Sequence, residues 1–417
     1  MDYIIKRSDS KLIENEKYWL LIYGRRKVGK TFLLRELCKF DNYFTIKKDI
    51  SVISNNETIS INNMVENVKK LLLDNKTVVI DEFQRLNEST LEELSLLHPK
   101  GKLILSGSSL RITKKIFEPK SPLLGFFTPI KMSLIQPSDM ILNLHKKIQD
   151  EKLIEICTFL REPWIIPNYN EEETINFIYN IITKSKQIIT GLIGEIFTEE
   201  ERELTKKYEA ILSLIGSGIW NTKELTSILY SRKLIPDPSP NHIIQYLKNL
   251  EEMELVESIN LHKAKGKYYR LISPLMNIYY YLDSRYNISS RTISLEEAKP
   301  TLQKLINLEI QNFIADLFSE IYEGRKEYFV LKDKEVDFII TKRNKPEIIG
   351  EVKWKIIDQE DINKFIKNSE RLNGRRVLIC KNSKIKSENI ENIQIINPKS
   401  LIALVEEFKK KQNKISI

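Results

Sequence analysis

The chain has 417 residues, of which 41% are apolar and 29% are charged, so it is long enough for two or three globular domains. Its 66 Lys and Arg residues outnumber 57 Asp and Glu residues, and the resulting net charge of +9 favours polyanionic partners such as nucleic acid. The absence of an apolar run of about 18 residues and of a signal-peptide core argues against a membrane protein and predicts a cytoplasmic one.

The order of the predicted elements divides the chain into three zones. In residues 1–195, short apolar runs alternate with helical stretches, which predicts a parallel sheet covered by helices. Residues 196–290 are mainly helical and end in a hairpin, and residues 291–417 begin with a helix and continue as a second α/β unit. The polar stretch 287–300 is the best linker candidate. The sequence therefore predicts an α/β protein with three domains that have these bounds.

A phosphate-binding loop is predicted at residues 24–31, which read GRRKVGKT and fit the pattern GxxxxGK[ST]. An apolar strand at 19–23 enters the loop, and a helix at 32–40 leaves it. Gly24 and Gly29 allow the backbone to curl so that its N–H groups face phosphates, while the helix N-terminus adds the positive end of its dipole. This context favours a nucleotide site over a chance match.

The loop supplies most of the predicted ATP-binding residues. Lys30 is expected to bridge the β- and γ-phosphates, and the hydroxyl of Thr31 is expected to bind Mg²⁺. The complete predicted set in the loop is Gly24, Arg25, Arg26, Lys27, Val28, Gly29, Lys30 and Thr31.

Two further strands end in polar residues that suit ATP hydrolysis. The apolar run TVVI is followed by Asp81, which is expected to hold the Mg²⁺ shell, and by Glu82, which is expected to orient and activate the attacking water. The next strand ends at Ser106 and Ser108, where a hydroxyl could sense the γ-phosphate. Three strands that end in suitable chemistry, in this order, predict an ATP-hydrolysing enzyme.

These segments resemble the archaeal ATPase family of AAA+-related P-loop proteins. The resemblance rests on GRRKVGKT, on VVIDEFQ at residues 78–84 and on LILSGSS at residues 103–109. It implies that Arg7, in the segment IIKRSDSKL, approaches the adenine or ribose. The family commonly reads SPLYGR after its sensor strand, whereas this chain has Phe126 in place of the arginine that would act across a subunit interface. The sequence is compatible with a homo-oligomer, but Phe126 replaces the arginine that would act across its subunit interface.

Residues 204–272 predict three helices followed by a hairpin, which is the order of a winged helix-turn-helix and matches the family that the chain resembles. In such a module the third helix enters the major groove and the wing contacts phosphates, so double-stranded DNA is the expected partner. The alternative is a structural lid whose basic residues are merely solvated. The candidate DNA-facing residues are Asn241, His242, Gln245, Lys248 and Asn249 on the helix and Lys263, Lys265 and Lys267 in the wing.

A second candidate active site lies in residues 309–353. Asp337 falls on one predicted strand, and Glu351 and Lys353 share one face of the next strand because side chains alternate. Glu309 falls within the apolar face of the preceding helix, where a carboxylate is costly unless it is paired or metal-bound. A salt bridge between Glu309 and Lys353 would satisfy it equally well.

This arrangement resembles the PD-(D/E)XK nucleases, a domain type with which the archaeal ATPase family often ends. The resemblance implies that Asp337 and Glu351 bind Mg²⁺ or Mn²⁺ with help from Glu309, while Lys353 positions or polarises the water that attacks a phosphodiester. We therefore expect an ATP-driven protein that acts on DNA, with metal-dependent cleavage in its last domain. The alternative is a nucleotide-dependent regulatory switch in which that domain serves only for docking.

Overall fold

The computed structural model describes residues 3–108, 116–119, 121, 123–200, 202–331, 334–385, 389–390 and 392–415. The chain divides into two compact units. We call the first, formed by Lys6–Ile135 and Leu192–Glu203, the N-terminal unit, and the second, formed by Met1–Ile5, Gln136–Gly191 and Leu204–Ile417, the C-terminal unit.

The N-terminal unit contains the first run of elements. Its helices are α1 (Ser8–Asn15), α2 (Lys30–Phe32) with a π-helical continuation (Leu33–Leu37), α3 (Ile61–Leu73), a 3₁₀ turn (Phe83–Arg85) and α4 (Glu88–Ser95). Its strands are β1 (Trp19–Tyr23), β2 (Asn42–Ile46), β3 (Val52–Ser54), β4 (Glu57–Ile59), β5 (Thr77–Asp81), β6 (Lys102–Gly107) and β7 (Phe127–Lys131). The helix predicted at 32–40 ends early because Cys38 adopts an extended backbone conformation.

The C-terminal unit contains most of the remaining elements. Its helices are α6 (Pro137–Leu144), α7 (Asp150–Leu160), a 3₁₀ turn (Pro163–Asn168), α9 (Lys206–Gly216), α10 (Thr222–Ser231), α11 (Asn241–Glu252), α12 (Pro274–Tyr286), α13 (Leu295–Tyr322), α14 (Gln359–Ser369) and α15 (Pro398–Ile415). Its strands are β8 (Val256–Leu261), β9 (Lys267–Leu271), β10 (Arg325–Leu331), β11 (Lys334–Lys342), β12 (Lys345–Ile357), β13 (Arg375–Ser383), β14 (Asn389–Ile390) and β15 (Ile393–Ile396). Helix α8 (Thr174–Glu199) begins in this unit, and its last residues belong to the N-terminal unit.

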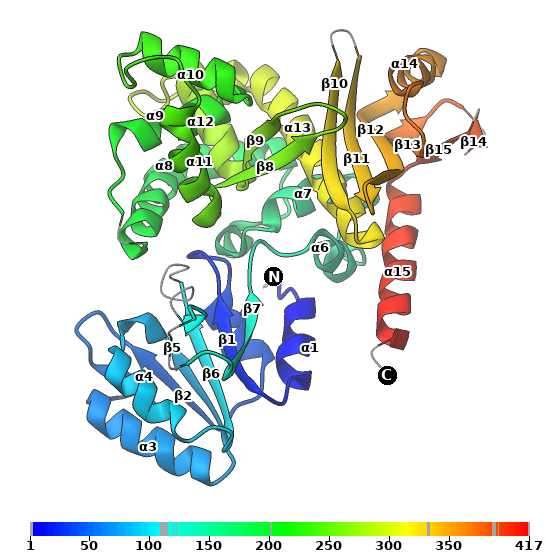
Figure 1. Ribbon diagram of the computed structural model, residues 1–417. Helices are drawn as coiled ribbons and strands as arrows, with labels where there is room; N and C mark the ends of the chain where they lie inside the picture. The colour runs from blue at the N-terminus through cyan, green and yellow to red at the C-terminus, as the bar shows by residue number, and fades with distance from the viewer. Residues whose placement is uncertain are drawn as a thin grey trace. The chain divides into compact units, whose positions relative to one another are not determined.

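The N-terminal unit is built on a seven-stranded sheet in the order β4-β3-β2-β5-β6-β1-β7 (Figure 1). Strands β2, β5, β6, β1 and β7 run parallel to one another. At the edge of the sheet, β3 pairs antiparallel with both β2 and β4. Trp19 and Leu21 pack in one core with residues of α3 and α4, whereas Leu20 and Ile22 pack in a second core with residues of α1 and the segment after the loop. The predicted helix-covered parallel sheet is therefore confirmed, since its central strands β5, β6 and β1 are buried on both faces.

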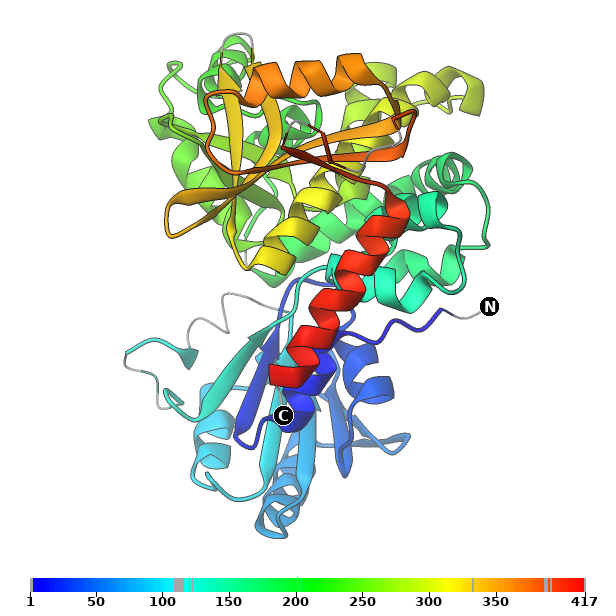
Figure 2. The ribbon, with the colours of Figure 1, turned by 90° about the vertical axis from the view of Figure 1, so that its right-hand side faces the viewer.

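The C-terminal unit is built on an eight-stranded mixed sheet in the order β14-β15-β13-β12-β11-β10-β8-β9. Strands β10, β11 and β12 form an antiparallel meander, after which β13 and β15 continue parallel to β12. Helices α14 and α13 both pack against this sheet (Figure 2). Ile362 and Phe365 of α14 lie in the core, and the ring of Phe318 on α13 lies 5.3 Å from that of Phe338 on β11. The two strands predicted to carry Asp337 and Glu351 are thus present as β11 and β12.

The two units differ from the three predicted domains. Residues 136–191 belong with the C-terminal unit and not with residues 1–135, and no unit boundary falls near residue 290. The reason for the second difference is that β8 pairs with β10, which makes the hairpin of the middle zone part of the C-terminal sheet. Within the predicted linker, α13 already begins at Leu295, because the side chain of Ser294 accepts a hydrogen bond from the backbone N–H of Glu297.

A buried network of ion pairs joins the hairpin to the rest of the C-terminal sheet. Asp316 on α13 pairs with Arg161 (2.6 Å), Arg270 (2.9 Å) and Lys326 (2.5 Å), and Glu257 pairs with Arg270 (2.7 Å) and Lys326 (2.7 Å). Burial alone would raise the pKa of Asp316, but the three cations hold that pKa well below its usual range. The carboxylate of Asp316 therefore balances the positive charges of three side chains from separate segments: the end of α7, β9 and β10.

Replacement of Asp316 is expected to destabilise the C-terminal unit strongly. Asp316→Ala leaves Arg270 and Lys326 with Glu257 and removes the network carboxylate of Arg161, and breaking a buried pair in this way typically costs about 3–5 kcal/mol. Urea unfolding followed by tryptophan fluorescence measures the change. Lys304→Ala, on the exposed face of the same helix, is the matched control and should stay within about 0.5 kcal/mol of wild type. Equal unfolding curves for Asp316→Ala and wild type would contradict this role.

Among the described residues, no helix is sufficiently long and apolar to cross a lipid bilayer.

Candidate functional site

The phosphate-binding loop has the backbone that its glycines predict. Gly24 has φ +155°, and a Cβ at this position would lie 1.9 Å from the carbonyl oxygen of Met132, so no side chain fits. Gly29, with φ +92°, starts α2 from a left-handed conformation. The buried Arg7 donates from its Nη1 to the carbonyl of Val28 (2.8 Å) and so braces the loop from within the N-terminal unit.

The side chain of Lys30 folds back onto the phosphate-binding loop. Its Nζ donates hydrogen bonds to the carbonyls of Gly24 (2.7 Å) and Arg25 (3.0 Å), and the side chain is 7% exposed. The other loop side chains differ in their surroundings. Lys27 is exposed, and Val28 packs in the apolar core. Of these side chains, the ammonium of Lys30 is therefore the cation placed over the curl of the loop.

The predicted Mg²⁺ ligands are Thr31, on α2, and Asp81, at the end of β5, and the structure brings them together. The hydroxyl of Thr31 donates to Oδ2 of Asp81 (2.8 Å), and the hydroxyl of Tyr43 donates to the same oxygen (2.7 Å). Asp81 is 2% exposed, and its strand β5 lies between β2, which carries Tyr43, and β6. A hydroxyl and a carboxylate held together are the donor pair that P-loop proteins use for Mg²⁺, so the residues present fit the metal.

Glu82 follows Asp81 in a left-handed backbone conformation, with φ +62°. Its Oε2 accepts hydrogen bonds from Gln84 Nε2 (2.9 Å) and pairs with Arg85 (2.9 Å), while Gln84 also donates to Ser108 Oγ (3.2 Å). Burial raises the pKa of Glu82, and Arg85 opposes that shift. A carboxylate with a raised pKa is a better general base near neutral pH than an ordinary one.

Ser106 completes this edge of the sheet. Its backbone lies in register with Asp81 on one side and Ile22 on the other, so it sits between the loop strand and the strand of the acidic pair. Within the part of the chain that the structure describes, Ser106 Oγ and Gln84 Oε1 are buried and have no hydrogen-bond partner. Buried polar atoms of this kind call for a partner, and a bound nucleotide with its water would supply one.

Arg26 lines an open cavity beside the loop. It pairs with Glu199 and, through Nε, with Glu195 (2.9 Å), both on the last turns of α8. The cavity has a volume of about 490 Å³, and all of its lining lies in the N-terminal unit. The lining residues are Arg26, Lys48, Gln84, Arg85, Gly194, Glu195, Thr198 and Glu199. This cavity therefore adjoins the two residues, Gln84 and Arg85, that hold Glu82.

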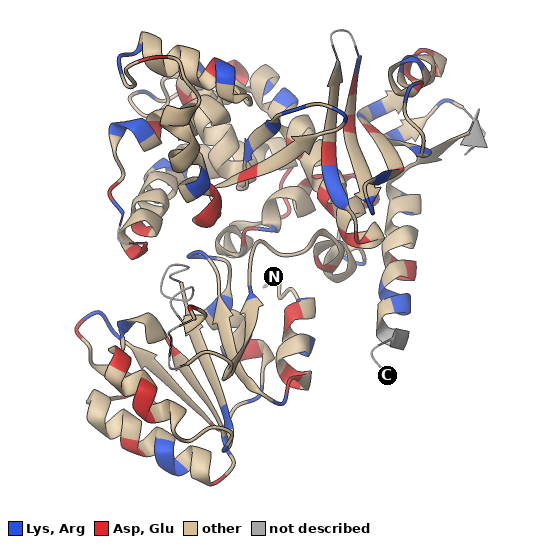
Figure 3. Cartoon of the chain, in the orientation of Figure 1, with Lys and Arg blue, Asp and Glu red and all other residues tan. Residues whose placement is uncertain are grey.

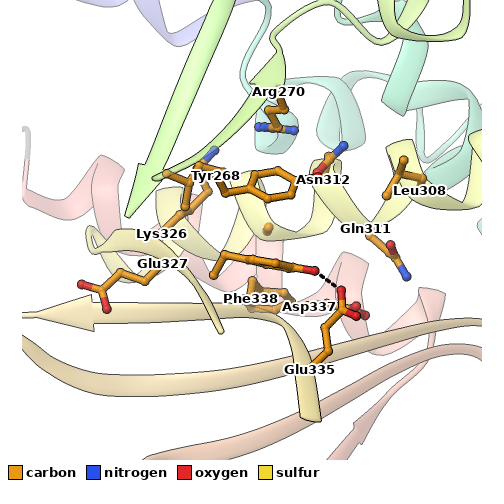
Figure 4. Close-up of a pocket in the computed structure, with 13 residues that line it drawn as sticks. Tyr268, Arg270, Leu308, Gln311, Asn312, Lys326, Glu327, Glu335, Asp337 and Phe338 are labelled. Atoms are coloured by element: carbon orange, nitrogen blue, oxygen red, sulfur yellow. Dashed lines mark hydrogen bonds between the residues drawn. The ribbon is translucent and has the colours of Figure 1, made fainter. Parts of the chain in front are cut away.

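The second candidate site lies in the C-terminal sheet. Asp337 Oδ2 accepts a hydrogen bond from the backbone N–H of Val352 (2.7 Å), and Lys353 pairs with Glu351 (2.6 Å), which is 4% exposed. Burial and the nearby charge of Glu351 raise the pKa of Asp337. Asp337 also lines a small cavity of about 60 Å³, in which Figure 4 shows it opposite Gln311 and Asn312 of α13.

Glu309 does not join Asp337 and Glu351. It accepts hydrogen bonds from Asn277 of α12 (2.5 Å) and from Asn312 (3.4 Å), and burial raises its pKa to about 7. Among the described residues, no three Asp, Glu, His or Cys side chains gather where they could hold a metal ion. The predicted three-carboxylate metal site and the alternative salt bridge between Glu309 and Lys353 are therefore both corrected, because α12 supplies the partner of Glu309.

The elements of the middle zone follow in the predicted order, but one residue of the third helix faces inward. Asn249 is 6% exposed and donates to the hydroxyl of Tyr208 (2.6 Å), so it cannot contact DNA. His242 is half-buried and pairs with Asp237 (2.9 Å). The predicted residues that remain exposed are Asn241, Gln245 and Lys248 on α11 and Lys263, Lys265 and Lys267 on the hairpin.

The structure adds residues that the sequence did not single out. Tyr43 reaches Asp81 because β2 is the parallel neighbour of β5, and a polar residue on an adjacent strand was the signal for it. Glu195 and Glu199 reach Arg26 from about 170 positions along the chain, and no local pattern marks them. Phe126, at the position of the family's arginine, stacks on His98 with ring centroids 4.9 Å apart.

The chain is 24% identical over 403 residues to an uncharacterized protein of Methanocaldococcus jannaschii. The alignment covers 88% of this chain and 90% of that protein.

Two solved structures are also similar. One is the ORC2 protein of Aeropyrum pernix in ADPNP–ADP complexes, which is 13% identical with a TM-score of 0.37. The superposed region covers 72% of this chain and 89% of the ORC2 chain. The other is the ORC1 protein of Aeropyrum pernix in complex with DNA, which is 14% identical with a TM-score of 0.31. The superposed region covers 70% of this chain and 96% of the ORC1 chain. At such TM-scores the likeness carries no argument about fold or function.

The family comparison is more specific. Residues 16–133 match the model of the AAA domain family. That segment includes the loop, the Thr31–Asp81 pair and Glu82. Residues 16–133 therefore form a P-loop ATPase domain of the AAA type.

Proposed function

We propose that this chain hydrolyses ATP and couples hydrolysis to work on double-stranded DNA. The observation that carries the ATPase part is the contact between Thr31 and Asp81, with Glu82 directly after Asp81 and Lys30 over the loop. Thr31 and Asp81 would hold Mg²⁺, which neutralises charge on the phosphates. Lys30 binds the terminal phosphates, and Glu82 takes the proton of the attacking water while Gln84 and Arg85 fix its carboxylate.

Phosphate release from ATP tests this proposal. The purified chain should release phosphate steadily in the presence of Mg²⁺, and EDTA should stop the release. A chain that binds ATP and Mg²⁺ but releases no phosphate above the background, at any pH between about 6 and 9, would contradict hydrolysis and leave a binding protein.

DNA contact is proposed at the hairpin of the C-terminal unit. Lys263, Lys265 and Lys267 are exposed in and beside the turn between β8 and β9, where basic residues gather (Figure 3). Lysines on such a wing can pair with phosphates whatever the base sequence, and each pairing releases a counterion. The exposed face of α11, with Asn241, Gln245 and Lys248, would supply contacts to base edges.

Charge reversal on the hairpin is expected to weaken binding to duplex DNA. Lys263→Glu with Lys265→Glu should lower the affinity at least about tenfold at low salt and reduce the salt dependence, because phosphate contacts are lost. Fluorescence anisotropy with a labelled duplex measures both. Arg343→Glu with Lys345→Glu, an equal charge change on the exposed β11–β12 turn, is the matched control. Equal losses for the two double variants would show only a general charge effect.

A second candidate activity is metal-dependent cleavage of DNA by the C-terminal unit. It is favoured by one observation, the group of Asp337, Glu351 and Lys353 on the two strands of a hairpin that α13 precedes, in which Glu351 is buried and the other two side chains are half-buried. A divalent cation such as Mg²⁺ or Mn²⁺ would relieve the repulsion between the two carboxylates, and Lys353 would polarise the water. The rival is a regulatory switch whose nuclease-like unit only docks.

Asp337→Ala separates cleavage from docking. Wild type should nick plasmid DNA with Mg²⁺ or Mn²⁺, and Asp337→Ala should lose at least about 100-fold in rate because it removes a ligand of the reacting cation. Glu347→Ala, an exposed carboxylate on the same hairpin, should nick as wild type does. Nicking that is equal in all three, or absent from all three, would remove the cleavage proposal and favour the switch.

A further inference from the structure

Arg26 stands at a position in the loop where its side chain can reach the end of a bound triphosphate. It lies two residues after Gly24 and four before Lys30, so its backbone forms part of the phosphate cradle. Its side chain lines the same cavity as Gln84 and Arg85, the residues that hold Glu82. Since Glu82 activates the water that attacks the terminal phosphate, this cavity is on the γ-phosphate side of the site.

Two carboxylates now neutralise Arg26. Glu199 and Glu195 lie one helical turn apart near the end of α8, and both pair with the guanidinium of Arg26. Although burial would lower the pKa of Arg26, Glu199 and Glu195 together with Glu82 raise it, so the guanidinium is firmly charged. Glu195 is half-exposed, whereas Glu199 is more buried.

The charges around the cavity fit an anion that competes with these carboxylates. Arg26, Lys48 and Arg85 line it as cations, Glu195 and Glu199 both pair with Arg26, and Glu82 pairs with Arg85. A γ-phosphate carries a comparable negative charge, and two of its oxygens can accept a bidentate pair of hydrogen bonds from an arginine, as the two oxygens of a carboxylate do. ADP has no such group, so the competition discriminates between the two nucleotides.

From this geometry we infer that Arg26 senses the γ-phosphate: ATP takes the guanidinium from Glu195 and Glu199, and ADP leaves it paired with them. The inference rests on the proposed ATPase function and adds the nucleotide-dependent step to it. Release of the two glutamates frees the end of α8, a helix whose first part belongs to the C-terminal unit. The carboxylates that Arg26 releases therefore belong to α8, which among the described helices is the one with residues in both the C-terminal and the N-terminal unit.

Binding of ATPγS and ADP to four variants tests the inference. Arg26→Ala should weaken ATPγS binding about tenfold and change ADP binding less than about twofold, because only ATPγS offers the charged acceptor that Arg26 loses. Glu195→Gln with Glu199→Gln should tighten ATPγS binding several-fold and leave ADP binding unchanged. The matched control is Glu88→Gln with Glu92→Gln, two exposed carboxylates one turn apart on α4 of the same unit.

The fourth variant combines Arg26→Ala with the two α8 substitutions and closes a double-mutant cycle. Once Arg26 is absent, neutralising Glu195 and Glu199 should no longer tighten ATPγS binding. Persistence of that effect, or equal changes for ATPγS and ADP in Arg26→Ala, would overturn the inference and leave the ion pairs as structural links. A wild-type chain that binds neither nucleotide would instead overturn the ATPase function, so the two failures are distinguishable. ADP affinity also reports whether each variant keeps an intact loop.

Discussion

Lys30→Ala is expected to abolish nucleotide binding at concentrations at which the wild-type chain is saturated. The ammonium lies over the loop and donates to the carbonyls of Gly24 and Arg25, from which it can transfer to phosphate oxygens. A charge-assisted hydrogen bond contributes about 1.5–3 kcal/mol, so the loss of contacts to two phosphates should raise the Kd by roughly 100-fold or more. Isothermal titration with ATP and with ADP measures this change.

The matched control for Lys30 is Lys27→Ala, which removes a lysine from the same loop. Lys27 is exposed, so its loss should change the Kd by less than about threefold. Because Lys30 also holds loop carbonyls, thermal unfolding of both variants must show that the N-terminal unit stays folded. Tight ATP binding by a folded Lys30→Ala variant would contradict the assignment of the nucleotide site.

Glu82→Gln is expected to keep ATP binding and to lose hydrolysis. Gln retains the size of the side chain and its contact with Gln84, but it cannot take a proton from the attacking water. General base catalysis typically contributes about 10²–10⁴-fold, and kcat should fall by that factor while the Kd for ATP stays within about threefold. Single-turnover phosphate release separates the chemical step from product release.

Glu88→Gln, an exposed carboxylate on α4, controls for the loss of one charge from this unit. A second control is the pH profile. Burial raises the pKa of Glu82, and hydrolysis by wild type requires the ionised form, so activity should rise with pH through a raised value and this limb should vanish in Glu82→Gln. Normal turnover by Glu82→Gln would show that another group accepts the proton.

The nucleotide site could be predicted because its chemistry is local. Gly24, Gly29, Lys30 and Thr31 are fixed by one short loop, and the loop needs glycine where a Cβ would meet Met132. The apolar run before Asp81 predicts a buried strand, and parallel strands bring their carboxyl ends to one edge. Spacing along the sequence was therefore enough to place these residues together.

The partners of isolated charged residues could not be predicted. The periodicity of α13 puts Glu309 on its buried face, but only the packing of α12 brings Asn277 to it in place of a metal or Lys353. Asn249 reads as an outward residue of α11 until Tyr208 of α9 is seen to receive its hydrogen bond. Helical periodicity gives a direction relative to the helix axis, and the identity of the neighbour depends on a second helix.

Local sequence was enough to predict the loop, the acidic pair at the end of β5, the parallel sheet and the second α/β unit, because each depends on nearby residues and on periodicity. The folded chain was needed to show that the β8–β9 hairpin extends the C-terminal sheet and that Glu195 and Glu199 pair with Arg26. Strand pairing and ion pairing at long sequence separation depend on where the whole backbone brings the groups, and no short segment encodes that.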